Sequence, residues 1–204
     1  MKMLLLVTLA IMVSCGGKTE AAGTPASPKA VVAAPEPEVE PEPPKENPLE
    51  RIQRMSSMDE AFAYASPLME DTVDESSKGT FLFTFWAMKH MTLLDVRVGT
   101  DETSFQKARK DPEEELGKKL CVSGTVIQIQ VQKTDWGKAY EGLMSTPNGN
   151  LYKFLAVRST GDLVSMSKAR LCGVFTGLYD YHNSGGGMGH ALSLVGVFDL
   201  PENN

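Results

Sequence analysis

The polar side chains best suited to binding a ligand gather in one stretch near the C-terminus of the 204-residue chain. The candidate residues of this stretch are Tyr179, Tyr181, His182, Gly185, Gly186, Gly187 and His190. A run this rich in glycine cannot form a regular strand, so we expect a mobile or tightly turning connection between two strands. We regard this segment as a candidate ligand-binding loop.

Two other interpretations of the same stretch remain open. Asp180, His182 and His190 could ligate a metal ion at the base of the loop, although their spacing is not that of a known metal motif. The glycines do not suit a phosphate site, because they lead into a strand and not into a helix N-terminus. The simplest alternative is a flexible hairpin tip between polar strand ends.

Motifs of nucleophilic and metal-dependent catalysis do not occur in the sequence. There is no Gly-x-Ser-x-Gly elbow, no His-Glu-x-x-His and no Cys-x-x-Cys. We therefore expect a protein that is not an enzyme, with no cofactor, no metal and no catalytic residue.

The N-terminus resembles an export signal. Lys2 precedes an apolar run from Met3 to Val13 that is broken only by Thr8. As a helix, this run would rise about 16 Å, roughly half the thickness of the hydrocarbon core of a bilayer. It therefore fits the apolar region of a signal peptide over residues 1–14 better than a permanent membrane span.

The residues Met12-Val13-Ser14-Cys15 resemble the lipobox of bacterial lipoproteins, although that family usually has Leu where this chain has Met12. The resemblance implies cleavage before Cys15 and attachment of fatty acyl groups, such as palmitate, to Cys15. Three acyl chains would anchor the mature protein to a membrane. Gly16 follows where Asp would signal retention in the inner membrane, so the resemblance implies the outer membrane, facing the periplasm.

Composition divides the remainder of the chain. Residues 15–48 are rich in Pro and Glu and contain no aromatic residue, so we expect a disordered linker behind the lipidated Cys15. From Gly16 to Glu115 there are 11 basic and 20 acidic residues, a net charge of −9, and from Leu116 to Asn204 there are 8 basic and 6 acidic, a net charge of +2. Neither half has the clustered Lys and Arg of a protein that binds nucleic acid or anionic lipid.

The pattern of residues 49–116 predicts a helical segment. Ser57 to Glu60 form a capping-box pattern, and an apolar stripe around Phe81 and Trp86 predicts a core helix between Gly79 and about Thr92. Asp111-Pro112 starts a further short helix that Gly117 ends. Because the stripe around Phe81 needs a surface to cover, we expect this segment to pack on the rest of the domain.

The pattern changes to strands in residues 117–204. Leu120, Val122, Gly124 and Val126 alternate on one face, after which Ile127, Ile129 and Val131 alternate on the other, which predicts a strand that bends through a bulge. Further strands are predicted at 139–144, 151–158, 170–181 and 189–200, with a short helix in 160–167. Five strands of this kind, with a helix between the third and the fourth, predict a five-stranded OB-fold barrel and an α+β fold overall that is mainly β.

Two of the strands also resemble a known family. The segments 117–126 and 170–177 resemble the first and fourth strands of the OB-fold domains known as tRNA-anticodon-binding-like. Cys121 and Cys172 remain after Cys15 is used for lipid, and residues alone leave a disulfide and two buried thiols equally open. The first and fourth strands are neighbours in the resembled fold, which implies a disulfide between Cys121 and Cys172.

Three functions follow as hypotheses. We favour a membrane-anchored module that binds a protein, peptide or glycan of the cell envelope through the loop and nearby aromatic residues: Trp136, Tyr140, Tyr152, Tyr179 and Tyr181. Some of these aromatics must belong to the core, and the sequence does not say which. Nucleic-acid binding is an alternative that we do not expect, because the basic residues Lys133, Lys138, Lys153 and Arg158 are few and scattered. A metal-dependent hydrolase that uses His182 and His190 is the third hypothesis.

Overall fold

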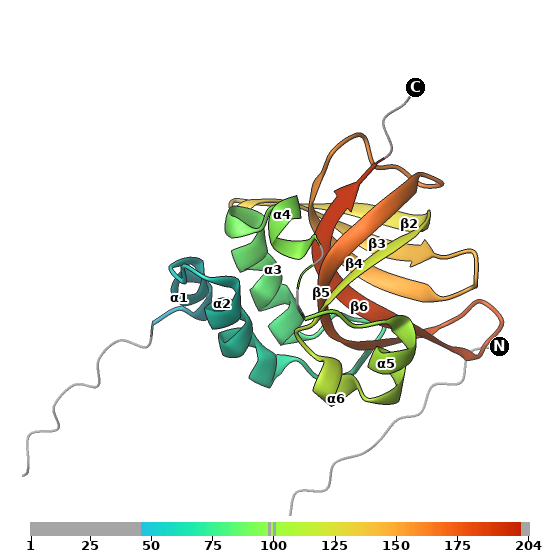
Figure 1. Ribbon diagram of the computed structural model, residues 1–204, viewed down its shortest axis with the longest axis horizontal. Coiled ribbons are helices and arrows are strands. Elements are labelled where there is room, and N and C mark those ends of the chain that lie inside the picture. The colour runs from blue at the N-terminus through green and yellow to red at the C-terminus, as the bar shows by residue number, and fades with distance from the viewer. Residues whose placement is uncertain (1–45, 98, 100, 201–204) are drawn as a thin grey trace, which may run out of the picture. The chain divides into compact units, whose positions relative to one another are not determined.

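The computed structural model describes residues 46–97, 99 and 101–200, all within one compact unit that spans residues 44–204 (Figure 1). The helices and strands have these bounds: α1 Pro48–Gln53, α2 Met58–Ala65, the 3-10 helix η1 Ser66–Leu68, β1 Thr72–Val73, α3 Lys78–His90, α4 Leu93–Val96, α5 Phe105–Lys110, α6 Pro112–Glu115, β2 Lys119–Thr134, β3 Gly137–Ser145, β4 Leu151–Ser159, β5 Lys168–His182 and β6 Met188–Asp199. The predicted signal peptide, Cys15 and nearly all of the predicted linker lie outside the described residues.

Short-range capping determines where the predicted helices begin. The Ser57 hydroxyl accepts a hydrogen bond from the Glu60 backbone at the start of α2, and the Asp111 carboxylate caps α6, where Pro112 is the first helical residue. Gly117 follows α6 with φ of +87°. These three predictions are confirmed, whereas the sequence pattern did not indicate α1, α4 or α5.

The first long strand bends where its pattern changes phase. In the pairing of β2 with β3, Val126 lies opposite Met144 and Gln128 lies opposite Leu143, so Ile127 is an extra residue. This bulge moves the inward face from one set of alternate residues to the other. The predicted bend is therefore confirmed at Ile127.

The order of strand pairing is that of an OB-like fold. β2, β3 and β4 form an antiparallel meander, β4 pairs with β6 in parallel, β6 pairs with β5, and β5 pairs with β2. The series of paired strands therefore begins and ends at β2. The structure has one strand more than the five predicted. The additional strand, β1, pairs two residues in parallel with the edge of β5 that does not face β6. A two-residue strand is too short to leave an alternating pattern in the sequence.

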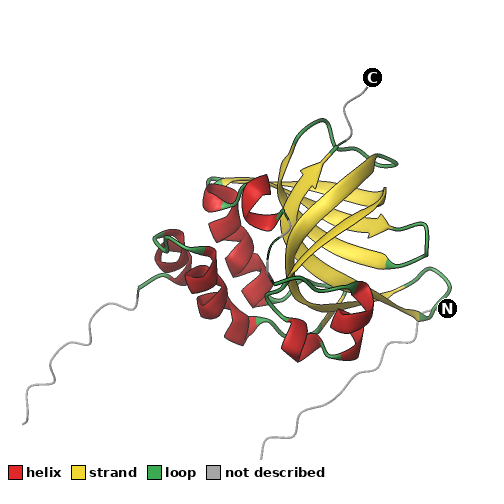
Figure 2. Cartoon of the chain, viewed as in Figure 1, coloured by secondary structure: helices red, strands yellow, loops and turns green. Residues whose placement is uncertain are grey.

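Two hydrophobic clusters hold the unit together. One fills the inside of the strand ring, around Phe154, Phe175 and Phe198. The other lies between the outer face of the strands and the helices, where Phe83 and Trp86 of α3 share a cluster with Val195 of β6. Figure 2 shows the helices gathered beside the strands. The expected packing of the helical segment on the sheet is observed.

The connection from β4 to β5 differs from its prediction. Residues 160–167 form bends and a turn and contain no helix. Met166 has φ of +68°, and its backbone N–H donates to Val126 O while Ser167 O accepts from Val126 N. The end of this segment therefore extends the edge pairing of β5 to β2, which a helix could not do.

Candidate functional site

The predicted ligand-binding loop is a tight, hydrogen-bonded turn between β5 and β6. The side-chain oxygen of Asn183 accepts hydrogen bonds from the backbone of Gly185 and Gly187, each at 3.0 Å, and Gly186 has φ of +81°. Asn183 N also donates to Gly187 O at 2.9 Å. Of the two forms expected for this segment, the tightly turning one is observed.

The two histidines at the base of this turn have separate carboxylate partners. His182 Nδ1 lies 2.6 Å from the Asp74 carboxylate, and His190 Nδ1 lies 2.6 Å from the Asp180 carboxylate. The hydrogen bond from His182 lowers the pKa of Asp74 below its usual value of 3.8. Among the described residues, no group of three or more His, Cys, Asp and Glu is arranged to hold a metal ion. The geometry therefore gives the metal-dependent hydrolase no support.

The two tyrosines before the turn pack on the sheet. Tyr179 is only 7% exposed, and its ring stacks on that of Tyr181 with 6.0 Å between centroids. The Tyr181 ring covers Gly189 of β6, where a Cβ atom would lie 2.2 Å from the ring. These rings fill the sheet surface instead of presenting free faces to a ligand.

The remaining candidate aromatic residues divide between core and surface. Tyr152 is 3% exposed inside the strand ring and Tyr140 packs against the same cluster. Trp136, in the turn between β2 and β3, is 44% exposed and meets Phe85 of α3 edge to face. Some of the five aromatic residues were expected to belong to the core, and the structure identifies Tyr152 and Tyr179 as the buried ones.

The structure shows a polar groove that the sequence pattern did not indicate. Lys153 Nζ lies 2.6 Å from Glu141 Oε1, and their side chains are only 10% and 18% exposed. The same Nζ lies 4.9 Å from the centre of the Tyr179 ring. The groove has a volume of about 210 Å³, and its lining side chains include Asp74, Gln128, Gln130, Glu141, Lys153 and Tyr179. We call it the β3–β4 groove.

The electrostatics of the β3–β4 groove favour a ligand that donates hydrogen bonds. Among the described residues that line it, Lys153 is the only cation and is already paired with Glu141, while Asp74 adds a second carboxylate. Burial, followed by the nearby Asp74 and Glu141 charges, raises the pKa of Tyr179 above its usual 10.0, so its hydroxyl stays protonated and able to donate. Carboxylates accept hydrogen bonds, and the Gln128 and Gln130 amides both donate and accept. Such a set recognises hydroxyl and amide groups and disfavours phosphates.

Two of the scattered basic residues bond to other groups of the protein. Lys153 is paired in the groove, and Arg158 Nε donates to the Met91 carbonyl at 2.9 Å. Lys133 and Lys138, at the end of the β2–β3 hairpin, are exposed, as is Arg158 near the end of β4. This distribution does not build the basic stripe that a nucleic-acid site needs.

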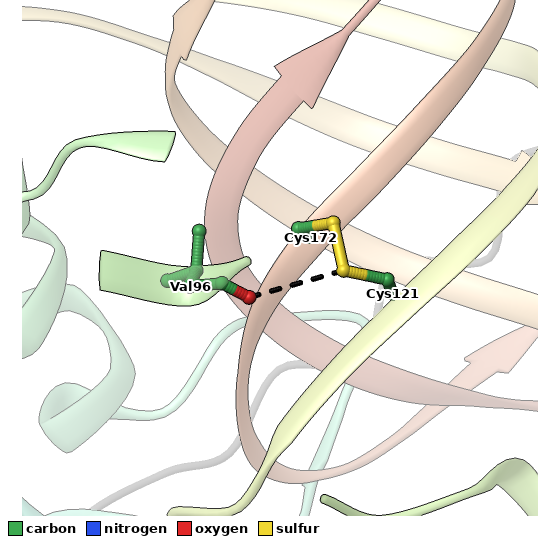
Figure 3. Close-up of a disulfide and its surroundings, with 3 residues drawn as sticks. All are labelled: Val96, Cys121 and Cys172. Carbon is green, nitrogen blue, oxygen red and sulfur yellow. Dashed lines mark hydrogen bonds between the residues drawn. A yellow bond between two sulfur atoms is a disulfide. The ribbon is translucent and has the colours of Figure 1, made fainter. Parts of the chain in front are cut away.

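The structure joins Cys121 and Cys172 by a disulfide (Figure 3). The two residues lie directly opposite each other where β2 pairs with β5. Cys172 is buried in the cluster beneath the helices, and the Val96 carbonyl oxygen of α4 lies 3.8 Å from Cys121 Sγ. The disulfide thus links two strands at the point where α4 covers them.

In the part of the chain that the structure describes, no helix is both long and apolar enough to cross a membrane. The proposed attachment residue Cys15 lies outside that part.

The chain has little similarity to known proteins. No family model and no curated protein matches the chain. Among solved structures, the chain is similar to the mitochondrial single-stranded DNA-binding protein Rim1 of S. cerevisiae, with 16% identity and a TM-score of 0.29 over 43% of this chain and 98% of that one. This likeness is too low to support an argument about function. The order of strand pairing is what makes the chain OB-like.

Proposed function

We propose that this chain is a lipid-anchored protein of the bacterial cell envelope whose OB-like unit binds an oligosaccharide in the β3–β4 groove. The observation that carries the proposal is the chemistry of the groove, in which carboxylates and amides surround an internally paired lysine. OB folds use this strand face and the adjoining loops to bind oligonucleotides or oligosaccharides. The acidic groove favours the second class, because a phosphate backbone would meet Asp74 and Glu141.

Anchoring rests on the sequence around Cys15 and is a separate part of the proposal. The acyl groups on Cys15 would hold the unit at the outer membrane, facing the periplasm, behind a Pro- and Glu-rich linker. Intact-mass measurement of the native protein tests it. We expect a chain that starts at Cys15 and carries added acyl mass; a chain that starts elsewhere, or lacks that mass, contradicts anchoring.

Calorimetric titration of the mature chain with a peptidoglycan-derived tetrasaccharide tests the ligand class. We expect saturable binding that Gln128→Ala and Gln130→Ala weaken by about fivefold each, since each substitution removes one amide that bonds a sugar hydroxyl. Gln106→Ala, at an exposed position on α5, serves as the matched control.

A single-stranded oligonucleotide in the same assay tests the alternative. Binding that weakens steeply with added salt would favour the nucleic-acid function. No binding of the tetrasaccharide would reject the proposed oligosaccharide and leave an envelope protein or peptide as the partner to seek by capture from membranes.

A further inference from the structure

Among the residues that the structure describes, the second half of β2 has one strand neighbour and one open edge. Pairing of β2 with β5 ends at Thr125 opposite Lys168, and the backbone bonds of Val126 to Met166 and Ser167 extend it by one residue. From Gln128 to Thr134, β2 pairs only with β3 among the described residues. An edge strand of this length is a template for pairing with another strand.

The geometry of the hairpin identifies which backbone groups point outward. Thr134 pairs with Gly137 across a two-residue turn, so alternate residues from Thr134 backwards exchange hydrogen bonds with β3. Ile129, Val131 and Lys133 therefore direct their N–H and C=O groups away from β3. These groups can bond to a second strand without disturbing the sheet.

The side chains along this edge are self-complementary. The run from Val126 to Gln132 contains no charged residue, no proline and no glycine. Gln128, Gln130 and Gln132 lie on one face of the strand, while Ile129 and Val131 lie on the other. Each Gln amide both donates and accepts, so a row of Gln can bond to an identical row. An antiparallel pair of these strands would place no like charges opposite each other within the run.

Exposed apolar side chains gather along the same edge. Three of the large hydrophobic side chains exposed on the described surface lie on β2 or in the turn after it, and two lie in the connection that reaches β5 beside Val126: Ile127, Val131 and Trp136, then Val164 and Met166. Val131 is 50% exposed and Met166 is 71% exposed. The backbone bond between Met166 and Val126 places Met166 beside the start of the free edge. Exposed apolar groups concentrated in this way indicate a surface that is covered by a partner.

We propose that two copies of this chain pair through β2, antiparallel and around a two-fold axis at Gln130. In this register, Ile129 of one copy exchanges backbone hydrogen bonds with Val131 of the other, and Gln128 faces Gln132. Lys133 then lies opposite Ile127, so the two Lys133 side chains stay apart. A two-fold axis makes one self-complementary strand sufficient for both halves of the interface.

Pairing of two copies through β2 would also add polar groups beside the β3–β4 groove. Gln128 and Gln130 line the β3–β4 groove, and they share a face of β2 with Gln132. Two strands joined at Gln130 would place the two Gln rows side by side, so each copy contributes amides next to the groove of the other. The dimer would present one polar surface across two copies. The pairing itself does not depend on which ligand the groove binds.

Sedimentation of residues 16–204, which lack the lipid-bearing Cys15 and keep the disulfide intact, tests the proposal without the lipid. We expect a dimer at about 100 μM, since a Kd of about 10 μM would leave most chains paired at that concentration. Gln130→Glu and Gln130→Lys should each weaken pairing by about tenfold or more, because each places two like charges at the axis. An equimolar mixture of the two variants should restore the dimer.

Two further variants separate edge pairing from other causes. Val131→Pro removes an N–H that faces away from β3, so the chain should stay folded, as judged by its melting curve, but become monomeric. Gln106→Glu and Gln106→Lys change charge at an exposed position on α5 and should leave the dimer intact. A wild-type chain that is monomeric at about 100 μM, or a dimer that survives Val131→Pro and both Gln130 changes, overturns the proposal.

Discussion

At the scale of single residues, the β3–β4 groove depends on one ion pair that is nearly removed from solvent. Lys153 occurs in the apolar strand β4, where its neighbours Tyr152 and Phe154 point into the strand ring. Lys153 itself points outward and meets Glu141 of β3. A charge in such a position is held by its partner, so the two residues act as a unit.

Removing one member of this pair should therefore destabilise the protein. We expect Glu141→Ala to lower the free energy of unfolding by about 3 kcal/mol, because it leaves the Lys153 ammonium without its partner. The double change Glu141→Leu with Lys153→Met should cost much less. Urea unfolding followed by circular dichroism measures both. If the single and double variants lose the same free energy of unfolding, the Lys153 and Glu141 charges are not coupled.

Tyr152 should make stability fall at high pH. Burial raises the pKa of Tyr152 from 10.0 to about 12. The unfolded chain therefore releases this proton at a lower pH than the folded one, and stability should decrease as pH rises from about 10 to 12. Tyr152→Phe should reduce that slope in urea unfolding measured across this range. An unchanged slope would assign the loss to other groups.

At the scale of elements, β5 and β6 approach each other so closely that no side chain fits between them at one point. Gly173 and Gly196 lie opposite each other, and a Cβ on Gly196 would lie 2.1 Å from the Cys172 carbonyl oxygen. The Cys172 carbonyl belongs to the backbone of β5, so it cannot move away by a change of rotamer as a flexible side chain would. Glycine is needed here for space, and not for a special φ.

Gly196→Ala should consequently destabilise the sheet by about 2 kcal/mol, through forced separation of the two strands. Gly161→Ala serves as the control, because a Cβ there would meet only Leu200 side-chain atoms at 3.5 and 3.8 Å. Thermal unfolding of both variants measures the difference. Equal melting temperatures for the two variants would contradict the close approach.

At the scale of the whole molecule, the disulfide links the strand ring where the helices cover it. Cys121 and Cys172 are 51 residues apart in sequence, and the loop that they close contains β3, β4 and the connection to β5. A cross-link of this span reduces the freedom of the unfolded chain more than that of the folded one. Its main effect should therefore be on global stability.

Loss of the disulfide should lower the free energy of unfolding by about 4 kcal/mol in the chain-entropy model. Urea unfolding of the mature chain with and without reductant measures this effect, and Cys121→Ala with Cys172→Ala should reproduce the reduced protein. A midpoint that reductant does not move would show that the bond is absent or contributes nothing.

Much of the fold was predictable because its signals are local. The phase change at Ile127, the caps at Ser57 and Asp111 and the four later strands all follow from residues close together in the sequence, since periodicity and capping act over a few residues. The helix expected in 160–167 was wrong because Met166 and Ser167 pair with Val126 instead. That contact joins distant residues and leaves no local pattern.

The candidate site was predicted only in part, and Tyr179 is the one predicted residue that lines the groove. The sequence by itself determined the alternation of the strands, the helix ends and the Cys15 motif. Only the tertiary structure decided that His182 meets Asp74, 108 residues away, that the Tyr181 ring covers Gly189, and that one edge of β2 has no strand beside it among the described residues. The reason is physical: a side chain's own strand determines which way it points, but the strand beside it determines what it meets.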